Sequence, residues 1–465
     1  MRGVVILCIL NFMGYLGHAQ SNKVNFRIEG QGSYTTPDHV PFWMRTNQYG
    51  SVPLSGASAS AIGRISKDYD TTRHQILDWG AAVEGRANGG KGSNATLIEG
   101  YGKVKLWIFE LKGGRTRDVM GLADTLLTAG NFAISGTALG IPKVQIGIPE
   151  FYALPILGRI FAFKGNYAHG WVGYTEVRNR RIPGADTYFH QKSLWGRIGK
   201  DDWKFKFYGG FNDNAFWGNE RALFSSYIQT DWESYQSVVF GKKWNGSKVG
   251  NHVGVIDVRL EYDFKNVLVA AYRQSYYEVG ALYHLANIAD GLNGLSIINK
   301  NIGTKAVKWR KFLFEFVYTK NQAGEPWSKP TKTGNENYLN HYLYTDGWSY
   351  KGIGLGLPFI TREADARKGQ VTREGYHFIN NRLYAVHTGF TGSLGRWDGL
   401  VKLSYSRNFG THETKTFVPV SQFSGYAEAH TNLSPDLQIG GIIALDYGKL
   451  LYNSGAFLVK ASKSF

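Results

Sequence analysis

The stretch Asp257-Val258-Arg259-Leu260-Glu261-Tyr262-Asp263-Phe264 alternates strictly between charged and apolar residues. Successive side chains of a β-strand point to opposite faces, so this stretch predicts a strand with one charged and one apolar face. The polar pair Lys265-Asn266 follows, and an apolar run resumes at 267–272, which predicts a β-hairpin with a short connection. With 43% apolar residues, about three such octets arise by chance in 465 residues, so one run does not decide the fold.

The same pattern returns along the chain, with turn residues between the runs. At 203–207, Trp-Lys-Phe-Lys-Phe alternates aromatic residues with lysines after a polar turn at 200–202. Residues 401–406 alternate in the same way, and 423–431 joins 437–446 through Ser-Pro-Asp. Repeated short strands separated by turns predict an all-β, antiparallel protein.

Composition favours a membrane barrel over a soluble β-sandwich or propeller, although alternation alone suits all of them. The 28 Tyr, 27 Phe and 13 Trp provide for the aromatic girdles of a barrel at both membrane interfaces. The chain ends in an alternating stretch, 457–465, whose last residue is Phe465. This resembles the terminal strand by which outer-membrane barrels are recognised for insertion. We therefore expect an outer-membrane β-barrel of a Gram-negative bacterium, with an exported soluble β protein as the fold-level alternative.

The first residues have the features of a secretory signal peptide. Arg2 supplies a positive start, an apolar run covers 4–16, and Gly17-His18-Ala19 forms a small-x-small cleavage site. We expect a signal peptide over 1–19 and a single barrel domain over 20–465. Cys8, the only cysteine, lies in the signal peptide, so disulfides and Cys-ligated metals are excluded from the mature chain. No segment has the run of about 18 apolar residues that a membrane-spanning helix requires.

The length of the mature chain predicts about sixteen to eighteen antiparallel strands, because a membrane strand needs about 9–11 residues and each hairpin adds one short and one long connection. A barrel of this width is an open channel unless something fills it. We expect loops or short helices to occlude the lumen, and the stretches 214–252 and 320–376 are long enough to do so. Apolar residues at helical spacing over 282–298 predict a short loop helix.

Catalytic signatures are absent from the sequence or weak. Residues 85–91 match the spacing of a phosphate-binding loop, but Gly92 stands where a hydroxyl should bind magnesium, and a Gly-rich hairpin turn explains the stretch better. There is no H-E-x-x-H helix and no G-x-S-x-G turn. A Ser-His-acid site assembled from distant strands, around His341 or His387, stays open. We expect no enzyme activity, no catalytic residues, no cofactor and no metal.

The net charge of +17 indicates anionic partners. The cations are spread along the chain without a cluster, which argues against nucleic acid, as does export. Lipopolysaccharide phosphates and acidic polysaccharides are the partners that such surfaces favour at a cell exterior. A solvated lumen wall explains the charge equally well.

Two predicted loops combine aromatic rings with amide, carboxylate and guanidinium groups. Sugars stack their C–H faces on rings and bind planar polar groups through their hydroxyls. Aromatic girdle residues beside polar turns are the structural alternative. The candidate polysaccharide-binding residues are Trp217, Asn219, Glu220, Arg221, Tyr338, Asn340, His341, Trp348, Tyr350 and Arg382.

Several short motifs resemble the Wzi capsule-assembly family as it occurs in Bacteroidetes. They are Pro41-Phe42-Trp43 with Asn47-Gln48-Tyr49-Gly50, Asn340-His341 with Gly347-Trp348-Ser349-Tyr350 and the stretch 352–358, and Asn380-Asn381-Arg382.

The resemblance covers most of the mature chain and implies an eighteen-stranded, occluded outer-membrane barrel. Such a protein acts as a lectin that holds capsular polysaccharide at the cell surface, and we expect it to be a monomer. The enterobacterial form of the family carries a periplasmic helical bundle, whereas 21–79 here shows no clear pair of helices. An outer-membrane porin or transporter for oligosaccharides or other solutes is the alternative function.

Overall fold

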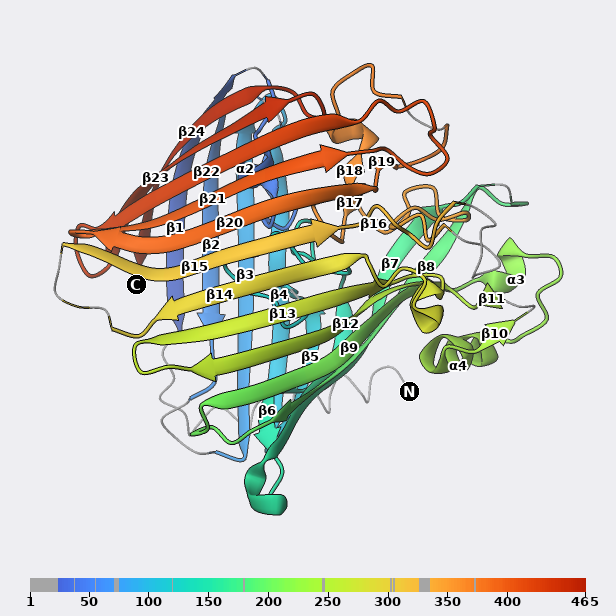
Figure 1. The fold of residues 1–465 in the computed structure, drawn as a ribbon, viewed down its shortest axis with the longest axis horizontal. Coiled ribbons are helices and arrows are strands. Elements are labelled where there is room, and N and C mark those ends of the chain that lie inside the picture. Colours follow the sequence, from blue (N-terminus) through green and yellow to red (C-terminus); the bar gives the residue numbers. More distant parts are fainter. Residues whose placement is uncertain are drawn as a thin grey trace, which may run out of the picture.

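The computed structural model describes residues 24–465, except 37, 55, 71–74, 119, 179, 245–246, 302, 304–305, 326–334 and 372–373. The predicted signal peptide, 1–19, lies outside the described residues. Eighteen antiparallel strands form one sheet that closes on itself, because β1 pairs with both β2 and β24 (Figure 1). The predicted all-β fold and strand number are confirmed. Closure leaves no unpaired strand edge, as a sheet immersed in lipid requires.

The barrel strands and their bounds follow in chain order: β1 (Asn25–Thr36), β2 (Ser58–Lys67), β3 (Leu77–Gly90), β4 (Asn94–Leu106), β5 (Phe109–Arg115), β6 (Lys143–Ala153), β7 (Phe161–Glu176), β8 (Gly184–Ile198), β9 (Phe205–Trp217), β12 (Asn251–Asp263), β13 (Val267–Tyr277), β14 (Gly291–Asn299), β15 (Val307–Tyr318), β20 (Leu383–Leu394), β21 (Trp397–Asn408), β22 (Val420–Asn432), β23 (Leu437–Gly448) and β24 (Ser454–Ser464). The described parts of the loops contain three two-stranded ribbons: β10 (Lys243–Trp244) with β11 (Ser247–Lys248), β16 (Ser349–Tyr350) with β17 (Ile353–Gly354), and β18 (Thr361–Arg362) with β19 (Phe378–Asn380).

The two ends of the barrel differ in the length of their connections. One end carries short turns such as 395–396 and 433–436, together with the start of β1 and the end of β24. The other end carries the long loops 116–142, 218–250 and 319–382. Outer-membrane barrels place short turns in the periplasm and long loops outside the cell, which orients this barrel.

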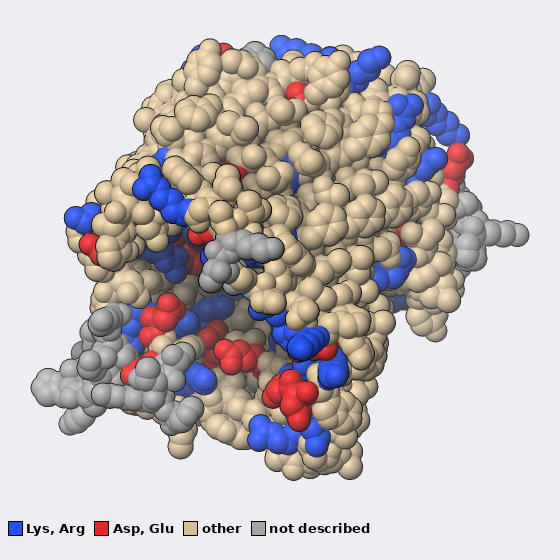
Figure 2. All heavy atoms as spheres, turned by 60° about the vertical axis from the view of Figure 1, so that its left-hand side comes forward, with Lys and Arg blue, Asp and Glu red and all other residues tan. Residues whose placement is uncertain are grey.

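The outer face of the wall is apolar and the lumen face is polar, as the alternation predicts. On β12, Ile256, Val258 and Leu260 point outward and are 40–48% exposed, whereas Asp257 points into the lumen and is 1% exposed. Figure 2 shows the same division, with a largely uncharged outer wall and a hollow lined by Lys, Arg, Asp and Glu. An apolar outside and a polar lumen are the arrangement of a membrane barrel and the reverse of a soluble β-sandwich.

The predicted hairpins are confirmed. β12 and β13 are joined through 264–266, β8 and β9 through 199–204, and β22 and β23 through 433–436. The stretch that mimics a phosphate-binding loop is the end of β3 and the turn after it.

Two predictions about the loops are wrong. The helix predicted over 282–298 is limited to a single turn, η2 (Ala281–His284), and β14 occupies the rest, where Gly291 and Gly294 favour a strand over a helix. The stretch 214–252 is expected to fill the lumen, but its helical part, 231–240, packs on the outside of the wall, and Phe216 and Leu223 join the apolar cluster inside the barrel.

Helices are few and short: α2 (Phe42–Arg45), α3 (Glu220–Leu223), α4 (Asp231–Phe240), η1 (Leu157–Arg159), η2 and η3 (Glu363–Asp365). Within the described residues, none of them has the length and apolar character needed to cross a membrane.

Candidate functional site

Three loop segments fold into the extracellular half of the lumen and form a plug. We call 40–52, 116–142 and 335–362 the plug segments. Their apolar residues pack with lumen-facing wall residues into one hydrophobic cluster. The large side chains at its centre are at most 1% exposed: Phe132, Tyr276, Tyr338, Leu339, Trp348 and Leu357. Occlusion by loops is therefore confirmed, and 335–362 is the part of the predicted stretch 320–376 that provides it.

Aromatic stacking fixes the plug against the wall. The ring centroids of Phe132 and Tyr276 are 4.2 Å apart, and those of Trp348 and Phe216 are 4.3 Å apart. The Trp348 indole also donates to the carbonyl of Ala133 at 2.8 Å, which joins two plug segments. A close-packed apolar core of this kind excludes water from the space that it fills.

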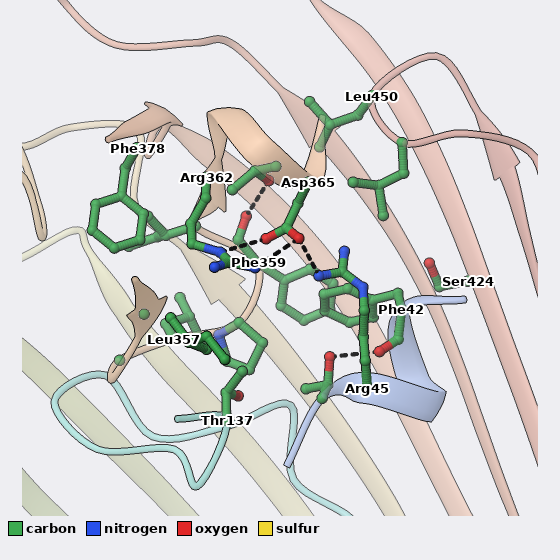
Figure 3. Close-up of a pocket in the computed structure, with 18 of the residues that line it drawn as sticks. Phe42, Arg45, Thr137, Leu357, Phe359, Arg362, Asp365, Phe378, Ser424 and Leu450 are labelled. Carbon is green, nitrogen blue, oxygen red and sulfur yellow. Dashed lines mark hydrogen bonds and ion pairs between the residues drawn. The ribbon is translucent and has the colours of Figure 1, made fainter. Parts of the chain in front are cut away.

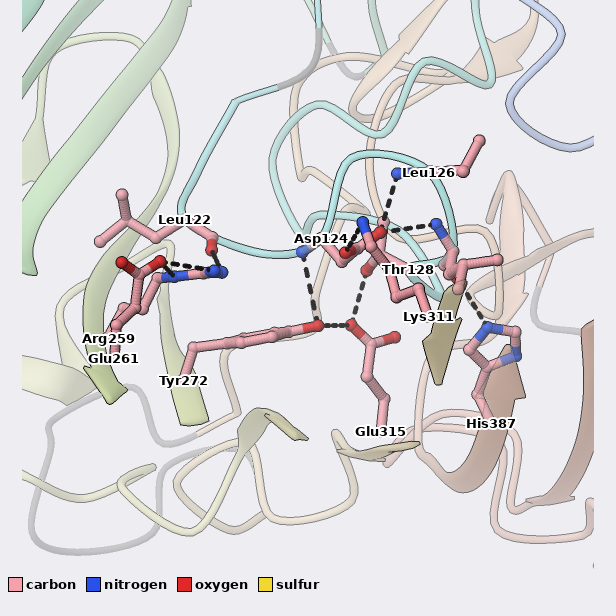
Figure 4. Close-up of polar contacts among 11 residues, drawn as sticks. Leu122, Asp124, Leu126, Thr128, Arg259, Glu261, Tyr272, Lys311, Glu315 and His387 are labelled. Carbon is pink, nitrogen blue, oxygen red and sulfur yellow. Dashed lines mark hydrogen bonds and ion pairs between the residues drawn. The ribbon is translucent and has the colours of Figure 1, made fainter. Parts of the chain in front are cut away.

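One buried carboxylate ties the segment 116–142 to the wall. Glu315 on β15 is 0% exposed and accepts hydrogen bonds from the Thr128 hydroxyl at 2.8 Å and from the Ala129 amide at 2.5 Å (Figure 4). The Tyr272 hydroxyl, from β13, donates to the same carboxylate. Because two of these hydrogen bonds come from the segment 116–142, Glu315 is a polar anchor of the plug.

Further polar contacts hold the lower part of the same segment. Lys311 pairs with Asp124 at 2.7 Å, and Arg259 donates to the Leu122 carbonyl at 2.9 Å. All of these wall residues point into the lumen from β12 to β15 (Figure 4). The plug is therefore held by apolar packing toward the extracellular end and by contacts with charged wall residues nearer the periplasm.

A second set of charges joins the other two plug segments next to a small cavity (Figure 3). Asp365 lies between Arg45 at 2.5 Å and Arg362 at 2.7 Å. Burial raises the pKa of this carboxyl, but the two guanidinium groups outweigh burial and hold its pKa below the ordinary value. The adjoining cavity has about 50 Å³, room for a few water molecules only.

Below the plug, the lumen widens into a charged vestibule. Its larger part, about 560 Å³, lies against β1 to β4 and β22 to β24, and a smaller part of about 250 Å³ lies against β5 to β8. The charged residues that line the larger part are Arg27, Glu29, Arg64, Glu84, Arg86, Glu99, Arg117, Glu428 and Lys460.

Many of these charges are paired between different strands of the wall. Arg64 contacts Glu84 at 2.9 Å and also Glu99, while Lys460 contacts Glu428 at 2.5 Å. Arg117, from a plug segment, reaches down to the same Glu84. The vestibule is therefore wide enough for a small polar solute and nearly neutral overall.

Six of the sequence-predicted sugar-binding residues are buried inside the loops. They are between 0% and 6% exposed: Trp217, Glu220, Tyr338, Asn340, Trp348 and Tyr350. Some of their polar atoms have internal partners: the Tyr338 hydroxyl donates to Asp290 at 2.8 Å, and the Asn340 amide donates to the Phe378 carbonyl at 2.8 Å. In this structure they pack the plug or the outer wall, and their role in sugar binding stays a prediction.

The other four lie nearer the surface. Arg221 is exposed, Asn219 and His341 are half-buried at the extracellular end, and Arg382 donates to the Lys320 carbonyl at 3.1 Å. Burial, together with the charges of Arg178 and Arg180, lowers the pKa of His341 to about 3, so its ring is neutral at pH 7.

The structure reveals a surface group that sequence reasoning missed. Arg180 lies 4.4 Å from the ring centroid of Phe224 and 5.7 Å from that of Tyr342, which is 59% exposed. We call these three residues the outer platform. They come from three different extracellular loops, so no spacing in the sequence indicates that they lie together.

A Ser–His pair does occur on the lumen side of the neighbouring strands β20 and β21. His387 Nδ1 lies 2.8 Å from the Ser404 hydroxyl, and its Nε2 contacts the Leu127 carbonyl at 2.6 Å. A backbone carbonyl thus takes the position that a carboxylate occupies in a catalytic triad. Both side chains are at most 3% exposed, and the cavity beside Ser404 is the one of about 50 Å³. Within the described residues, no group of three or more His, Cys, Asp or Glu could hold a metal ion.

Comparison with known proteins gives a likeness of fold only. No protein-family model and no curated protein sequence matches this chain. Among solved structures, OprD of Pseudomonas aeruginosa matches with 9% identity and a TM-score of 0.49 over 96% of this chain and 95% of that one. OccAB4 of Acinetobacter baumannii has 8% identity and a TM-score of 0.47 over 96% and 99%. OccK2 of P. aeruginosa, in complex with glucuronate, has 8% identity and a TM-score of 0.45 over 96% and 98%.

Four features indicate a membrane-spanning barrel: the closed wall, the apolar outer band, the polar lumen, and the difference in length between the connections at the two ends. The chain is an 18-stranded β-barrel of the Gram-negative outer membrane.

Proposed function

We propose that this barrel is a non-enzymatic protein that holds a surface polysaccharide at its extracellular end, as the resemblance to the Wzi family implies. The plug carries the proposal. Because its apolar core fills the extracellular half of the lumen, a polymer outside the cell meets the loops rather than an open channel.

The outer platform provides suitable chemistry for such a polymer. The exposed ring of Tyr342 offers a stacking surface for the C–H face of a sugar, and the adjacent Arg180 guanidinium matches carboxylate or phosphate groups. The exposed Arg221 adds positive charge at the same end of the barrel. Each sugar unit is expected to bind weakly, with retention coming from many repeats that engage many copies of the protein.

A glycan pull-down with the folded protein in detergent tests the proposal. The capsule of the protein's own strain should be retained and an unrelated capsule should not. Tyr342→Ala and Arg180→Ala should each reduce retention, whereas Tyr283→Ala, which removes an 89% exposed ring from another extracellular loop, should not. Equal retention by all variants, or by both capsules, would contradict the proposal.

A solute channel is the second candidate, and the vestibule favours it. Cavities of about 560 and 250 Å³ just below the plug are large enough for a sugar or an amino acid. Passage then requires the plug segments to move. Discrete conductance steps of the wild-type protein in planar bilayers would favour the channel, and a flat baseline would favour the binding protein.

A further inference from the structure

The loop 218–250, which we call the flap, covers a polar area on the outside of the barrel. Near the extracellular ends of β8, β9 and β12, the outward positions hold Lys192, Asp213 and His252 where an apolar wall would be expected. Asp213 pairs with Lys192 at 3.0 Å and with His252 at 3.1 Å. Lipid tails cannot satisfy such groups, so they must lie outside the hydrocarbon region or under a cover.

The flap packs onto this area through α4. Val238 of α4 joins Ala215, Trp217, Tyr227 and Val249 in a small hydrophobic cluster separate from the plug. The helix is well formed, because Thr230 and Glu233 make reciprocal capping bonds at its N-terminus.

Direct bonds set the height of α4 on the wall. Lys192 donates to the Val239 carbonyl, and the hydroxyls of Tyr167 and Tyr235 are bonded to each other. The next outward positions toward the periplasm are Leu194 and Phe211, which are 49% and 39% exposed. Two residues span about 7 Å along a strand. The C-terminal half of α4 therefore lies at the edge of the lipid-facing band.

The exposed surface of the flap is apolar along α4 and basic just after the C-terminal end of this helix. Trp232 and Phe240 lie eight positions apart on one side of α4 and are 65% and 70% exposed, and Ile228 just before the helix is 76% exposed. Lys242 and Lys243, both exposed, follow Phe240 after one glycine, Gly241. The carboxylates Asp231 and Glu233 lie at the opposite end of the helix, about 15 Å away at 1.5 Å per residue.

We propose that α4 and the turn after it form a docking surface for the phosphorylated glycolipid headgroups of the outer leaflet, with Trp232 and Phe240 at the acyl boundary and Lys242 and Lys243 on the phosphates. Aromatic residues prefer the membrane interface, and ammonium groups close to an anionic membrane surface strengthen binding. The positive charge of Lys242 and Lys243 and the place of α4 at the edge of the lipid-facing band thus favour a lipid headgroup as the ligand. This inference is independent of what the extracellular loops bind.

Lipopolysaccharide binding by the folded, full-length barrel in detergent is the first test. Lys242→Gln/Lys243→Gln should weaken binding by about fivefold per lysine. Lys265→Gln is the matched control, because it removes an exposed lysine from the periplasmic turn 264–266, and it should bind as the wild type does. Dephosphorylated lipopolysaccharide should bind the wild type and the double variant equally weakly. Equal affinity of the double variant and the wild type for intact lipopolysaccharide would overturn the proposal.

The source of the phosphate and the depth of the helix are tested separately. Inorganic phosphate at the same phosphorus concentration should not displace the glycolipid, and full displacement would show a simple anion site instead. Phe240→Cys introduces a unique label position, since Cys8 in the predicted signal peptide is the only other cysteine. A fluorophore there should be quenched by spin-labelled lipid in vesicles that contain lipopolysaccharide. A label that stays unquenched would show that α4 stands clear of the membrane and would also overturn the proposal.

Discussion

The two halves of the lumen are enclosed by the same strands but filled with opposite chemistry. In the extracellular half, aromatic and aliphatic side chains such as Trp348 and Phe132 are 0% exposed and exclude water. In the periplasmic half, paired charges such as Arg64 and Glu84 surround open space. The lumen face of the wall is partly apolar where it meets the plug, as at Phe216, and the inserted loops fill that half. Closure is a property of the loops, and the barrel itself is a wide cylinder.

Removing the largest plug segment should have the greatest effect. Replacement of 120–139 by a short Gly-Ser linker should open the lumen and raise single-channel conductance at least about tenfold, because an empty barrel of this width is a water-filled channel. The control is a flap shortened within 225–243, which lies outside the lumen and should leave the conductance of the wild type. A deletion variant that conducts no better than the wild type would show that the other two plug segments close the barrel on their own.

Trp348→Ala tests the dry half within an intact plug. The loss of a fully buried indole and of its bond to the Ala133 carbonyl should destabilise the loops by about 3–5 kcal/mol. Hydrogen exchange over 335–362 should increase strongly. Trp397→Ala, at a 37% exposed outward position, should leave exchange in these segments unchanged.

Glu315→Ala tests the anchor between the two halves. The change leaves the Thr128 hydroxyl, the Ala129 amide and the Tyr272 hydroxyl without their acceptor, and each buried unsatisfied group costs about 1–3 kcal/mol. Proteolysis within 116–142 and current noise in bilayers should both rise. Phe314→Ala, the lipid-facing neighbour, should leave both at wild-type levels, and an identical response of the two variants would remove Glu315 from its role as anchor.

A buried carboxyl at the top of the plug predicts a pH dependence. Burial raises the pKa of Glu278 well above 4.5, and the nearby Glu336 raises it further. A carboxyl with a raised folded pKa favours the folded state at low pH, and this contribution is lost as the pH rises through the folded pKa. Glu278→Gln should therefore be more stable than the wild type at about pH 8, with the difference shrinking toward about pH 4.5. Thermal melts across this range measure it, and a difference that grows on acidification would refute the assignment.

The smallest effect is expected in the vestibule. Arg64→Ala should lower the free energy of unfolding by about 1 kcal/mol or less, because the guanidinium is partly solvated and Glu84 keeps its contact with Arg117. Chemical denaturation should barely distinguish this variant from the wild type. A loss comparable to that of Trp348→Ala would mean that both halves of the lumen stabilise the barrel equally.

The wall could be predicted from the sequence because strand alternation is a local signal. Each residue of the run 257–264 follows its neighbour to the opposite face, and the hairpin turns lie within a few residues of the strands that they join. The plug segment 116–142 carries no such signal. Its place in the lumen depends on Glu315, Lys311 and Tyr272, which are far away in the sequence and become neighbours only after the barrel closes.

The candidate site illustrates the same limit. Trp348 and Tyr338 have the composition of a sugar-binding surface, but a ring in a long loop can equally well fill the lumen, and the local sequence does not distinguish these positions. The flap shows the opposite error. Its length predicted that it would fill the lumen, yet its helix α4 lies outside the barrel, where it covers the polar outward residues Lys192 and Asp213.

The pairing of the first strand with the last has a consequence for biogenesis. Ten residue pairs, from Arg27 with Ser464 to Thr36 with Gly455, join β1 to β24. Until the C-terminal strand arrives, β1 and the growing edge both expose unpaired backbone groups that lipid cannot satisfy. A chain that ends before residue 454 lacks the strand that completes the cylinder. Closure of the barrel therefore requires that the C-terminal strand has been made.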